Sequence, residues 1–442
     1  MDDIRAAVRS RDLEALQAAV ASAPQAEVAA ELVRVGTVDQ AVLFRLLQKD
    51  KALRVFERLD PRQQATLLDS LGADEVTELL EELDPDDRAR LLDEVPAKVA
   101  AKLLDRVSPA QRHGTGILLG YAPETAGRIM TPEYLSIRSE LTAGEALERV
   151  RRFGVDAETI DVLYVIDDQR RLIGVVTLRS LVLVQVDAIV GSIMNDDPVW
   201  ASTGDDREAV ARQLVAHDLL AIPVVDREHR LVGIVTVDDA VAVLEREDTE
   251  DVERIGGASP LDEPYITAPV RRIYRARVGW LLVLFVAEAL TGTVLRAFES
   301  VLESAVSLTF FVPLLIGTGG NAGSQTTTTI VRAMAIGEVR FGDAVHVMWK
   351  EVRVGLMLGA TMAGVGIVRA VTWGTGERLA FVVASALVAV VLLATFVGSL
   401  LPMLLRRLGL DPAVVSAPFI TTFVDAVGLL IYFLLARAIL GL

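Results

Sequence analysis

The sequence contains no cysteine and only four histidines among its 442 residues. The absence of cysteine excludes disulfide bonds, thiolate metal sites and cysteine nucleophiles. The histidines, at positions 113, 217, 229 and 346, are scattered along the chain and suggest no ligand cluster. No P-loop, HExxH motif or nucleophile elbow is present. We therefore do not expect an enzyme, and we expect any metal site to use oxygen ligands.

Basic residues are fewer than acidic ones: the sequence has 44 Lys and Arg and 60 Asp and Glu, which gives a net charge of −16. The imbalance is confined to residues 1–270, which carry −21, whereas residues 271–442 carry +5. A nucleic-acid binder with a basic surface is thereby excluded. The mean hydropathy of +0.42 is too high for a soluble protein of uniform composition. The chain therefore combines an acidic, polar head with an apolar second part.

The second part contains five apolar stretches that are long enough to cross a bilayer as helices, which takes about 20 residues. The clearest is Leu379–Leu405, which has no charged residue. In the third, Gly355 and Gly359 form a small-xxx-small pattern that lets helices approach closely. The five predicted spans are 278–295, 306–336, 347–371, 379–405 and 412–436.

The short segments between these spans indicate an orientation. Ten basic residues, beginning with Arg271 and Arg272, fall on the side of the acidic head, and four fall on the opposite side. Basic residues concentrate in cytoplasmic loops. We therefore expect an integral protein of a bacterial-type plasma membrane, with the head in the cytoplasm and the C-terminus outside.

Residues 1–125 show helical periodicity with an internal repeat. Leu59-Asp60-Pro61, Leu83-Asp84-Pro85 and Val107-Ser108-Pro109 lie 24 residues apart. Each places a helix N-cap residue before a proline at the first helical position. The period predicts stacked helical units, a superhelical domain. One interpretation is that this domain is only a scaffold.

Residues 126–243 contain a second duplication. The segment Ile129–Pro132 recurs as Ile193–Asp196, and Leu172–Thr177 recurs as Leu231–Thr236. Apolar runs of this length, separated by amphipathic stretches, predict two β-α-β-β-α units in tandem. The pattern resembles a pair of CBS (cystathionine-β-synthase) domains, a regulatory module.

The CBS resemblance carries an implication for nucleotides. In that family a Thr-x-x-Asp after the last strand holds a nucleotide ribose, and the second unit has Thr236 and Asp239 at these positions. The first unit has Thr177 and Ser180 instead. The resemblance thus allows ATP or a related nucleotide to bind at the second CBS unit and argues against nucleotide binding at the first.

An acidic segment follows, with six carboxylates in the nine positions 245–253. It predicts a connecting helix within residues 244–268. One interpretation is a solvated linker, the usual role of a run of charge. The other is that these carboxylates repel one another unless cations lie between them, and hard oxygen ligands suit Mg²⁺ or Ca²⁺.

The fifth span carries Asp425, with Thr421 and Gly428 on the same helical face. A carboxylate in mid-membrane costs about 2.5–3.5 kcal/mol on insertion scales and indicates a functional site. The alternative is a structural ion pair with another span. Glu288 in the first span is a second candidate, with Arg296 available to compensate its charge.

The second span contains four glycines in the seven positions 317–323. Because glycine weakens a helix by up to about 1 kcal/mol, the run predicts irregular backbone. Its exposed carbonyls, with Asn321 and a facing Asp425, would make an all-oxygen pathway through the membrane. The alternative is a close-packed helix crossing.

Over essentially its whole length the chain resembles the MgtE family of magnesium channels. The resemblance rests on the glycine-rich Gly317–Gln325, on Gly409–Ala413 and on Ser416–Tyr432. It implies a multi-domain architecture with a superhelical α-helical N-domain (1–125), an α/β CBS pair (126–243), an acidic connecting plug helix (244–268) and a five-span α-helical membrane domain (269–442).

The resemblance also implies a function, that of a homodimeric Mg²⁺-selective channel for magnesium uptake that intracellular Mg²⁺ closes. The pore would lie on the two-fold axis between the second and fifth spans. Asp425 would bind hydrated Mg²⁺, with Asn321 beside it and Asp411 at the cytoplasmic mouth. The further pore-lining residues would be Gly319, Gly320 and Thr421. The Mg²⁺-sensing residues would be Asp86, Asp87, Asp239, Glu247, Glu250 and Asp251.

Two other functions remain open. An ion-coupled secondary transporter of divalent cations would show inverted repeats, and none is evident among five spans. A membrane-anchored CBS nucleotide sensor would need no pore, and the glycine-rich second span and Asp425 argue against it.

Overall fold

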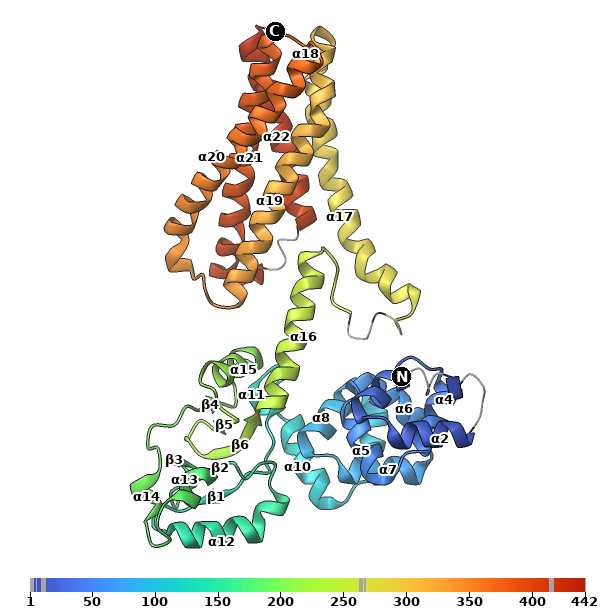
Figure 1. Ribbon diagram of the computed structural model, residues 1–442, viewed down its shortest axis with the longest axis vertical. Helices are drawn as coiled ribbons and strands as arrows, with labels where there is room; N and C mark the ends of the chain where they lie inside the picture. Colours follow the sequence, from blue (N-terminus) through green and yellow to red (C-terminus); the bar gives the residue numbers. More distant parts are fainter. Residues whose placement is uncertain are drawn as a thin grey trace. The chain divides into compact units, whose positions relative to one another are not determined.

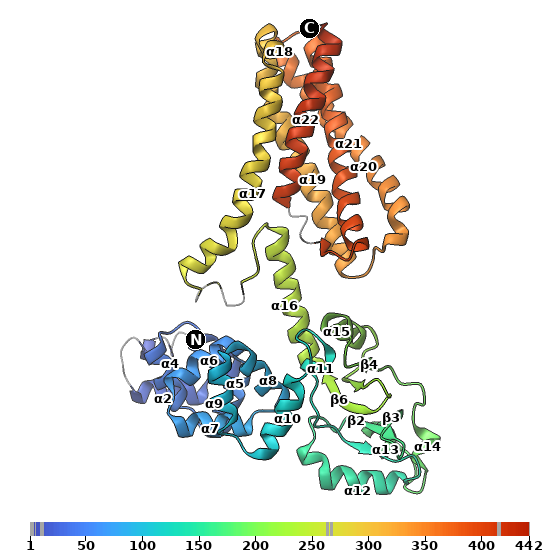
Figure 2. The ribbon, with the colours of Figure 1, turned by 180° about the vertical axis from the view of Figure 1, so that it is seen from behind.

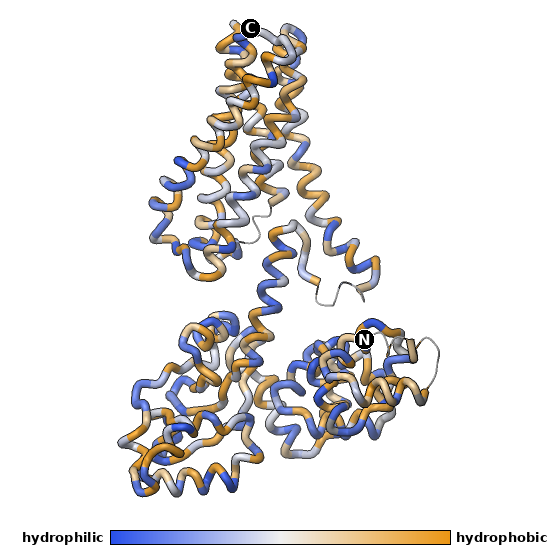
Figure 3. The backbone as a smooth tube through the Cα atoms, viewed as in Figure 1, coloured by the Kyte–Doolittle hydropathy of each residue, from blue (hydrophilic) through white to orange (hydrophobic). Residues whose placement is uncertain are grey.

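The computed structural model describes residues 4, 6–8, 13–261, 265, 268–412 and 417–441 (Figure 1). The chain forms two compact units, Met1–Glu247 and Asp248–Leu442. The first mixes polar and apolar residues along every element, whereas the long helices of the second are mainly apolar (Figure 3). The predicted division into a polar head and an apolar part is therefore confirmed.

The first unit begins with helices whose starts follow the 24-residue repeat. The carboxylate of Asp60 accepts hydrogen bonds from the backbone N–H groups of Arg62 and Gln63, both at 3.0 Å. Ser108 Oγ likewise accepts a hydrogen bond from the backbone N–H of Gln111 and caps the helix that follows it. The apolar faces share a core that includes Phe56. The helices are α2 (Leu13–Ser22), α3 (Gln25–Leu32), α4 (Thr37–Arg45), α5 (Lys49–Glu57), α6 (Pro61–Ser70), α7 (Ala73–Glu82), α8 (Pro85–Glu94), α9 (Ala97–Leu104) and α10 (Pro109–Leu119).

Two three-stranded sheets follow, as the duplication predicts, in the orders β1-β2-β3 and β4-β5-β6. In each sheet the first pair is parallel and the second antiparallel, with a bulge at the same place. The elements are α11 (Ala126–Ile129), β1 (Ser136–Ile137), α12 (Ala143–Phe153), η1 (Gly154–Asp156), β2 (Val162–Ile166), β3 (Leu172–Thr177), α13 (Leu178–Leu183), α14 (Val190–Ile193), β4 (Ala201–Ser202), α15 (Arg207–Ala216), β5 (Ala221–Val225) and β6 (Leu231–Thr236).

The repeated Ile-Met dipeptide joins the two CBS units to each other. Met130, from the start of the first CBS unit, lies over Gly233 of the second CBS unit. Met194, from the start of the second CBS unit, lies over Gly174 of the first CBS unit. A Cβ at either glycine would come within 2.8 Å of the facing methionine sulfur. The glycine and the methionine occur in both CBS units because the methionine of each unit packs against the glycine of the other.

Helix α16 (Val237–Ile255) starts directly after β6 and continues through the acidic segment. The last helix of the CBS pair and the predicted connecting helix are therefore one element. The boundary placed between residues 243 and 244 falls within it.

Among the described residues of the second unit, five helices are long and apolar enough to cross a membrane. Helices α19, α21 and α22 pack together, α20 lies against α21, and α17 lies against α22 (Figure 2). Gly355 and Gly359 are buried against α21, as the small-xxx-small pattern predicts. The elements are α17 (Val270–Ala297), α18 (Glu299–Ser304), η2 (Val306–Phe311), α19 (Val312–Ala335), η3 (Phe341–Asp343), α20 (Ala344–Thr372), α21 (Glu377–Arg407) and α22 (Ala417–Leu440).

The irregular backbone predicted for the glycine-rich span is wrong. Helix α19 runs unbroken from Val312 to Ala335. A Cβ at Gly319 would lie 2.5 Å from Val390 of α21, and one at Gly320 would lie 2.7 Å from Thr421 of α22. These glycines let three helices pack closely, which was the alternative interpretation, and no run of open carbonyls results.

Candidate cation sites

Three carboxylates meet in the first unit, Asp86 and Asp87 from the first turn of α8 and Asp239 from the first turn of α16. One oxygen from each lies within 4.8 Å of the others, the spacing of ligands around one metal ion. Of the described residues, only these form such a group with metal-binding geometry. Residues about 150 positions apart in the chain are thus brought together.

The three carboxylates, here called the acidic group, border a cavity of about 780 Å³. Arg54 and Arg58 also line it, but carboxylates predominate. Asp84 does not cap α8 with its side chain, although the repeat places it at the N-cap, and it lines the cavity instead. The further acidic residues around the cavity are Glu57, Asp84, Glu158, Asp238 and Glu245.

One arginine partly neutralises the acidic group. Arg90 pairs with Asp87 and lies 3.1 Å from Asp239. Thr236 Oγ1 also donates a hydrogen bond of 2.8 Å to Asp239. Asp86 is 95% buried, and its Oδ1 has no hydrogen-bond partner. The acidic group therefore keeps an excess of negative charge and one unsatisfied buried oxygen.

The electrostatics of the cavity favour protonation or a bound cation. Burial, followed by the charge of Asp239, raises the pKa of Asp86 well above its ordinary value. Burial, with Asp87 also contributing, raises the pKa of Asp239 to about 6. Burial and the charge of Asp84 raise the pKa of Glu158 to about 8. A divalent cation would relieve this repulsion without protonation.

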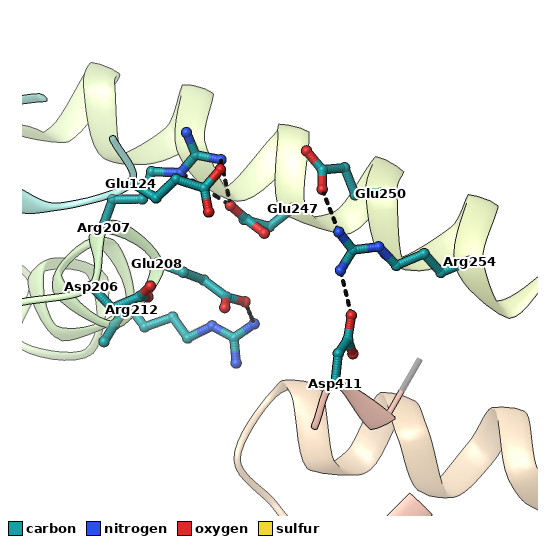
Figure 4. A network of polar contacts seen from close by, with 10 residues as sticks. Glu124, Asp206, Arg207, Glu208, Arg212, Glu247, Glu250, Arg254 and Asp411 are labelled. Atoms are coloured by element: carbon teal, nitrogen blue, oxygen red, sulfur yellow. Dashed lines mark hydrogen bonds and ion pairs between the residues drawn. The ribbon is translucent and has the colours of Figure 1, made fainter. Parts of the chain in front are cut away.

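The acidic part of α16 is neutralised mainly by arginines. Arg207 lies 2.8 Å from Glu247, and Arg332 lies 2.6 Å from Asp248. Arg254 bridges Glu250, at 3.2 Å, and Asp411 (Figure 4).

These pairs change the interpretation of the acidic helix. Its carboxylates need not rely on cations alone, since arginines from three parts of the chain already pair with them. Glu247, Glu250 and Asp251 do not join the metal-binding group formed by Asp86 and its neighbours. The sequence did not reveal the pairing arginines, because each lies far from its partner or within a mixed run of charge.

The second candidate site is Asp425 on α22. It is 93% buried among apolar residues, and its Oδ1 has no hydrogen-bond partner. One turn earlier, Thr421 Oγ1 donates to the carbonyl of Ala417 and lies 3.2 Å from Ser324 of α19. The structure thus places a buried carboxylate where α22 crosses the glycines of α19.

The other predicted membrane residues have different surroundings. Asn321 is exposed on α19 within the single chain, and Asp411 is engaged by Arg254. Gly319 and Gly320 are buried between helices. Ala413 and Ser416, which belong to two of the motifs, lie outside the described residues.

Three family descriptions match this chain. "Divalent cation transporter" matches residues 312–435, "MgtE intracellular N domain" matches residues 23–124, and "CBS domain" matches residues 126–187 and 190–246.

Whole proteins and solved structures agree with these matches. The magnesium transporter MgtE of Thermus thermophilus is 45% identical over 323 residues, which is 73% of this chain and 72% of that protein. The magnesium transporter MgtE of Bacillus subtilis is 36% identical over 322 residues, 73% of this chain and 71% of that protein. A crystal structure of the cytosolic domain of the Mg²⁺ channel MgtE in complex with ATP is 37% identical and covers 55% of this chain and 98% of its own, with a TM-score of 0.52.

Proposed function

The chain belongs to the MgtE family of magnesium transporters, and from this premise we propose that it is a homodimeric Mg²⁺ channel for magnesium uptake. In this proposal its acidic first unit lies in the cytoplasm and closes the channel when Mg²⁺ binds there. The distribution of basic residues between the spans supports that orientation, with the C-terminus outside.

The observation that carries the proposal is Asp425, a buried carboxylate without a hydrogen-bond partner in an apolar helix bundle. Such a group is costly in a membrane unless it faces water, a counterion or a permeating ion. Mg²⁺ loses its water shell reluctantly and is usually held through one or two carboxylates with waters retained. Two copies of Asp425 on a two-fold axis would provide this, with Asn321, exposed on α19, available to contact the waters.

Closure is assigned to the acidic group of Asp86, Asp87 and Asp239. With little Mg²⁺ in the cell, the carboxylates around the cavity repel one another, and the helical domain separates from the CBS pair. With more Mg²⁺, an ion joins α8 to α16 and favours the closed state. Such a switch needs only that the ion bind one state better than the other.

Recording from patches that contain the full chain tests this function. We expect Mg²⁺ current in the absence of Na⁺ or proton gradients, and we expect it to fall when Mg²⁺ is raised to millimolar concentration on the side of the head. A current that required a coupling gradient would instead indicate a secondary transporter. A patch without Mg²⁺ current would refute the proposal.

Inhibition by Mg²⁺ is expected to depend on pH. The pKa values of Asp239 and Glu158, about 6 and about 8, lie above those of an unfolded chain, so bound protons stabilise the folded first unit at low pH, and this contribution is lost as the pH rises from 6 to 8. Mg²⁺ must displace these protons to bind. Because roughly one proton is displaced, we expect the inhibitory Mg²⁺ concentration to fall about tenfold per pH unit, or about 100-fold between pH 6 and pH 8.

Current recordings at pH 6, 7 and 8 measure this dependence. Glu158→Gln removes the group that titrates near pH 8 and should flatten the upper half of the profile. Inhibition that is independent of pH in the unmodified protein would place the sensor away from this cavity.

We also propose ATP as a ligand of the CBS pair, at Thr236 and Asp239. The support is the structural relative in complex with ATP. Because Asp239 already pairs with Arg90, nucleotide binding there would compete with the acidic group. Titration of the full chain with ATP at low and high Mg²⁺ would detect this competition.

A further inference from the structure

Glu288 is a second carboxylate within the apolar part of the chain, and its surroundings do not satisfy it. It lies near the middle of α17, between apolar stretches on both sides, and is exposed in the single chain. It forms no hydrogen bond or ion pair with the part of the chain that the structure describes. Arg296, the counterion considered from the sequence, lies about 12 Å further along the helix and does not pair with it.

Two aromatic contacts fix the height of α17 against α22. Near their first turns in the bundle, the rings of Trp280 and Phe419 lie 6.5 Å apart. Near the other end, the rings of Phe298 and Phe433 stack at 5.3 Å. Both contacts follow the same chain direction, so the two helices run parallel, with 18 residues of α17 between the contacts against 14 residues of α22.

This register places Glu288 and Asp425 at the same depth. At a rise of 1.5 Å per residue, Glu288 lies about 12 Å above the first aromatic contact and Asp425 about 9 Å above it. Measured back from the second contact, the values are about 15 Å and 12 Å. Glu288 therefore lies about 3 Å above Asp425 when measured from the first contact and about 3 Å below it when measured from the second, in both cases less than one helical turn.

Glu288 borders the packed face of α17. Leu284 and Thr291, which are buried, lie one turn before and one turn after it on the same side of the helix. Thr291 Oγ1 has no hydrogen-bond partner, and neither has Asp425 Oδ1. Three polar groups without partners therefore lie at neighbouring heights on two helices that pack against each other.

From this arrangement we infer that Glu288 and Asp425 form one cation-binding centre, in which Glu288 is a second carboxylate that attracts the permeating hydrated divalent cation. The inference rests on the proposed function, because it takes Asp425 to face the ion path. Two like charges at one depth in an apolar bundle need a shared counterion. A dication that keeps its waters satisfies both carboxylates, and the Thr291 hydroxyl is placed to contact those waters.

The test measures Mg²⁺ flux into liposomes that contain the full chain, as a function of external Mg²⁺. Glu288→Gln keeps the shape of the side chain and removes one charge from each subunit. Through a water-filled path, we expect the half-saturating Mg²⁺ concentration to rise about fivefold with the maximal rate retained. Glu288→Asp keeps the charge and should stay within about twofold of the unmodified protein. Glu299→Gln, the same change in α18, should have no effect.

The outcomes separate this inference from the proposed function. If Asp425→Asn leaves flux unchanged, the proposed pore site is wrong. If Asp425→Asn stops flux while Glu288→Gln behaves like Glu299→Gln, only the role of Glu288 is refuted. A larger effect of Glu288→Asp than of Glu288→Gln would show that side-chain shape matters and not charge, and would also refute it. Should Glu288→Gln not yield folded protein, Glu288→Ala replaces it with the same expected rise.

Discussion

Asp425→Asn is expected to lower Mg²⁺ flux by about 100-fold while the protein stays folded. The change keeps the size of the side chain and removes its charge. In a two-fold symmetric pore it removes two carboxylates, and a loss of about tenfold for each is a modest estimate for a charge that directly attracts a dication. Among the residues that the structure describes, the buried Oδ1 of Asp425 has no partner, so we expect no structural ion pair to be broken. Flux into liposomes and the elution volume of the purified protein measure the two effects.

A matched control is Asp343→Asn, the same change on an exposed residue of η3 in the same unit. It should leave flux and folding unchanged. Normal flux through Asp425→Asn would contradict the pore assignment. Loss of folded protein with that variant alone would instead indicate that Asp425 holds a structural contact.

The positions of the apolar helices were predictable from the sequence, but their ends were less so. The predicted span 379–405 corresponds to α21, Glu377–Arg407, because an uninterrupted apolar run determines its own length. The first span was placed at 278–295, whereas α17 starts at Val270. Hydropathy identifies the residues that enter the bilayer. The helix itself extends further, through the flanking arginines, because its backbone hydrogen bonds continue there.

The glycine-rich span shows why composition alone gave a wrong prediction of irregular backbone. Glycine weakens helices where its peptide groups are open to solvent. In α19, Gly319, Gly320 and Gly323 instead face Val390, Thr421 and Ile420, and close packing with these neighbours outweighs the low propensity. That outcome depends on residues about 70 to 100 positions away, which no local pattern contains.

The acidic group was predictable only in part, for a related reason. Asp86, Asp87 and Asp239 were identified through the family resemblance, and the structure brings them together. Their counterion Arg90 was not identified, since an i, i+3 arginine on α8 gives no sign of reaching α16. The spacing that placed Asp84 at an N-cap was correct for the backbone, but it could not show that the side chain faces the cavity.

The second large effect is expected from Asp86→Asn combined with Asp239→Asn. These changes leave Asp87 paired with Arg90, so no buried arginine loses all its partners. The acidic group changes from three carboxylates and one arginine to a neutral pair. A cation would then gain nothing by binding there, and we expect the Mg²⁺ concentration that closes the channel to rise about 100-fold, or about tenfold for each carboxylate.

Stability measurements distinguish loss of the ion site from loss of the fold. In chelator, the variant should unfold at a higher temperature than the unmodified protein, because repulsion between buried carboxylates is removed. Added Mg²⁺ should stabilise the unmodified protein and leave the variant unchanged, since only a state that binds the ion is stabilised by it. Asp168→Asn with Asp187→Asn makes the same change in net charge on exposed residues of the same unit and should reproduce neither effect. Closure at the ordinary Mg²⁺ concentration in the Asp86 and Asp239 variant would mean that the controlling ion binds elsewhere, and α16 with its arginine pairs would then be the segment to test.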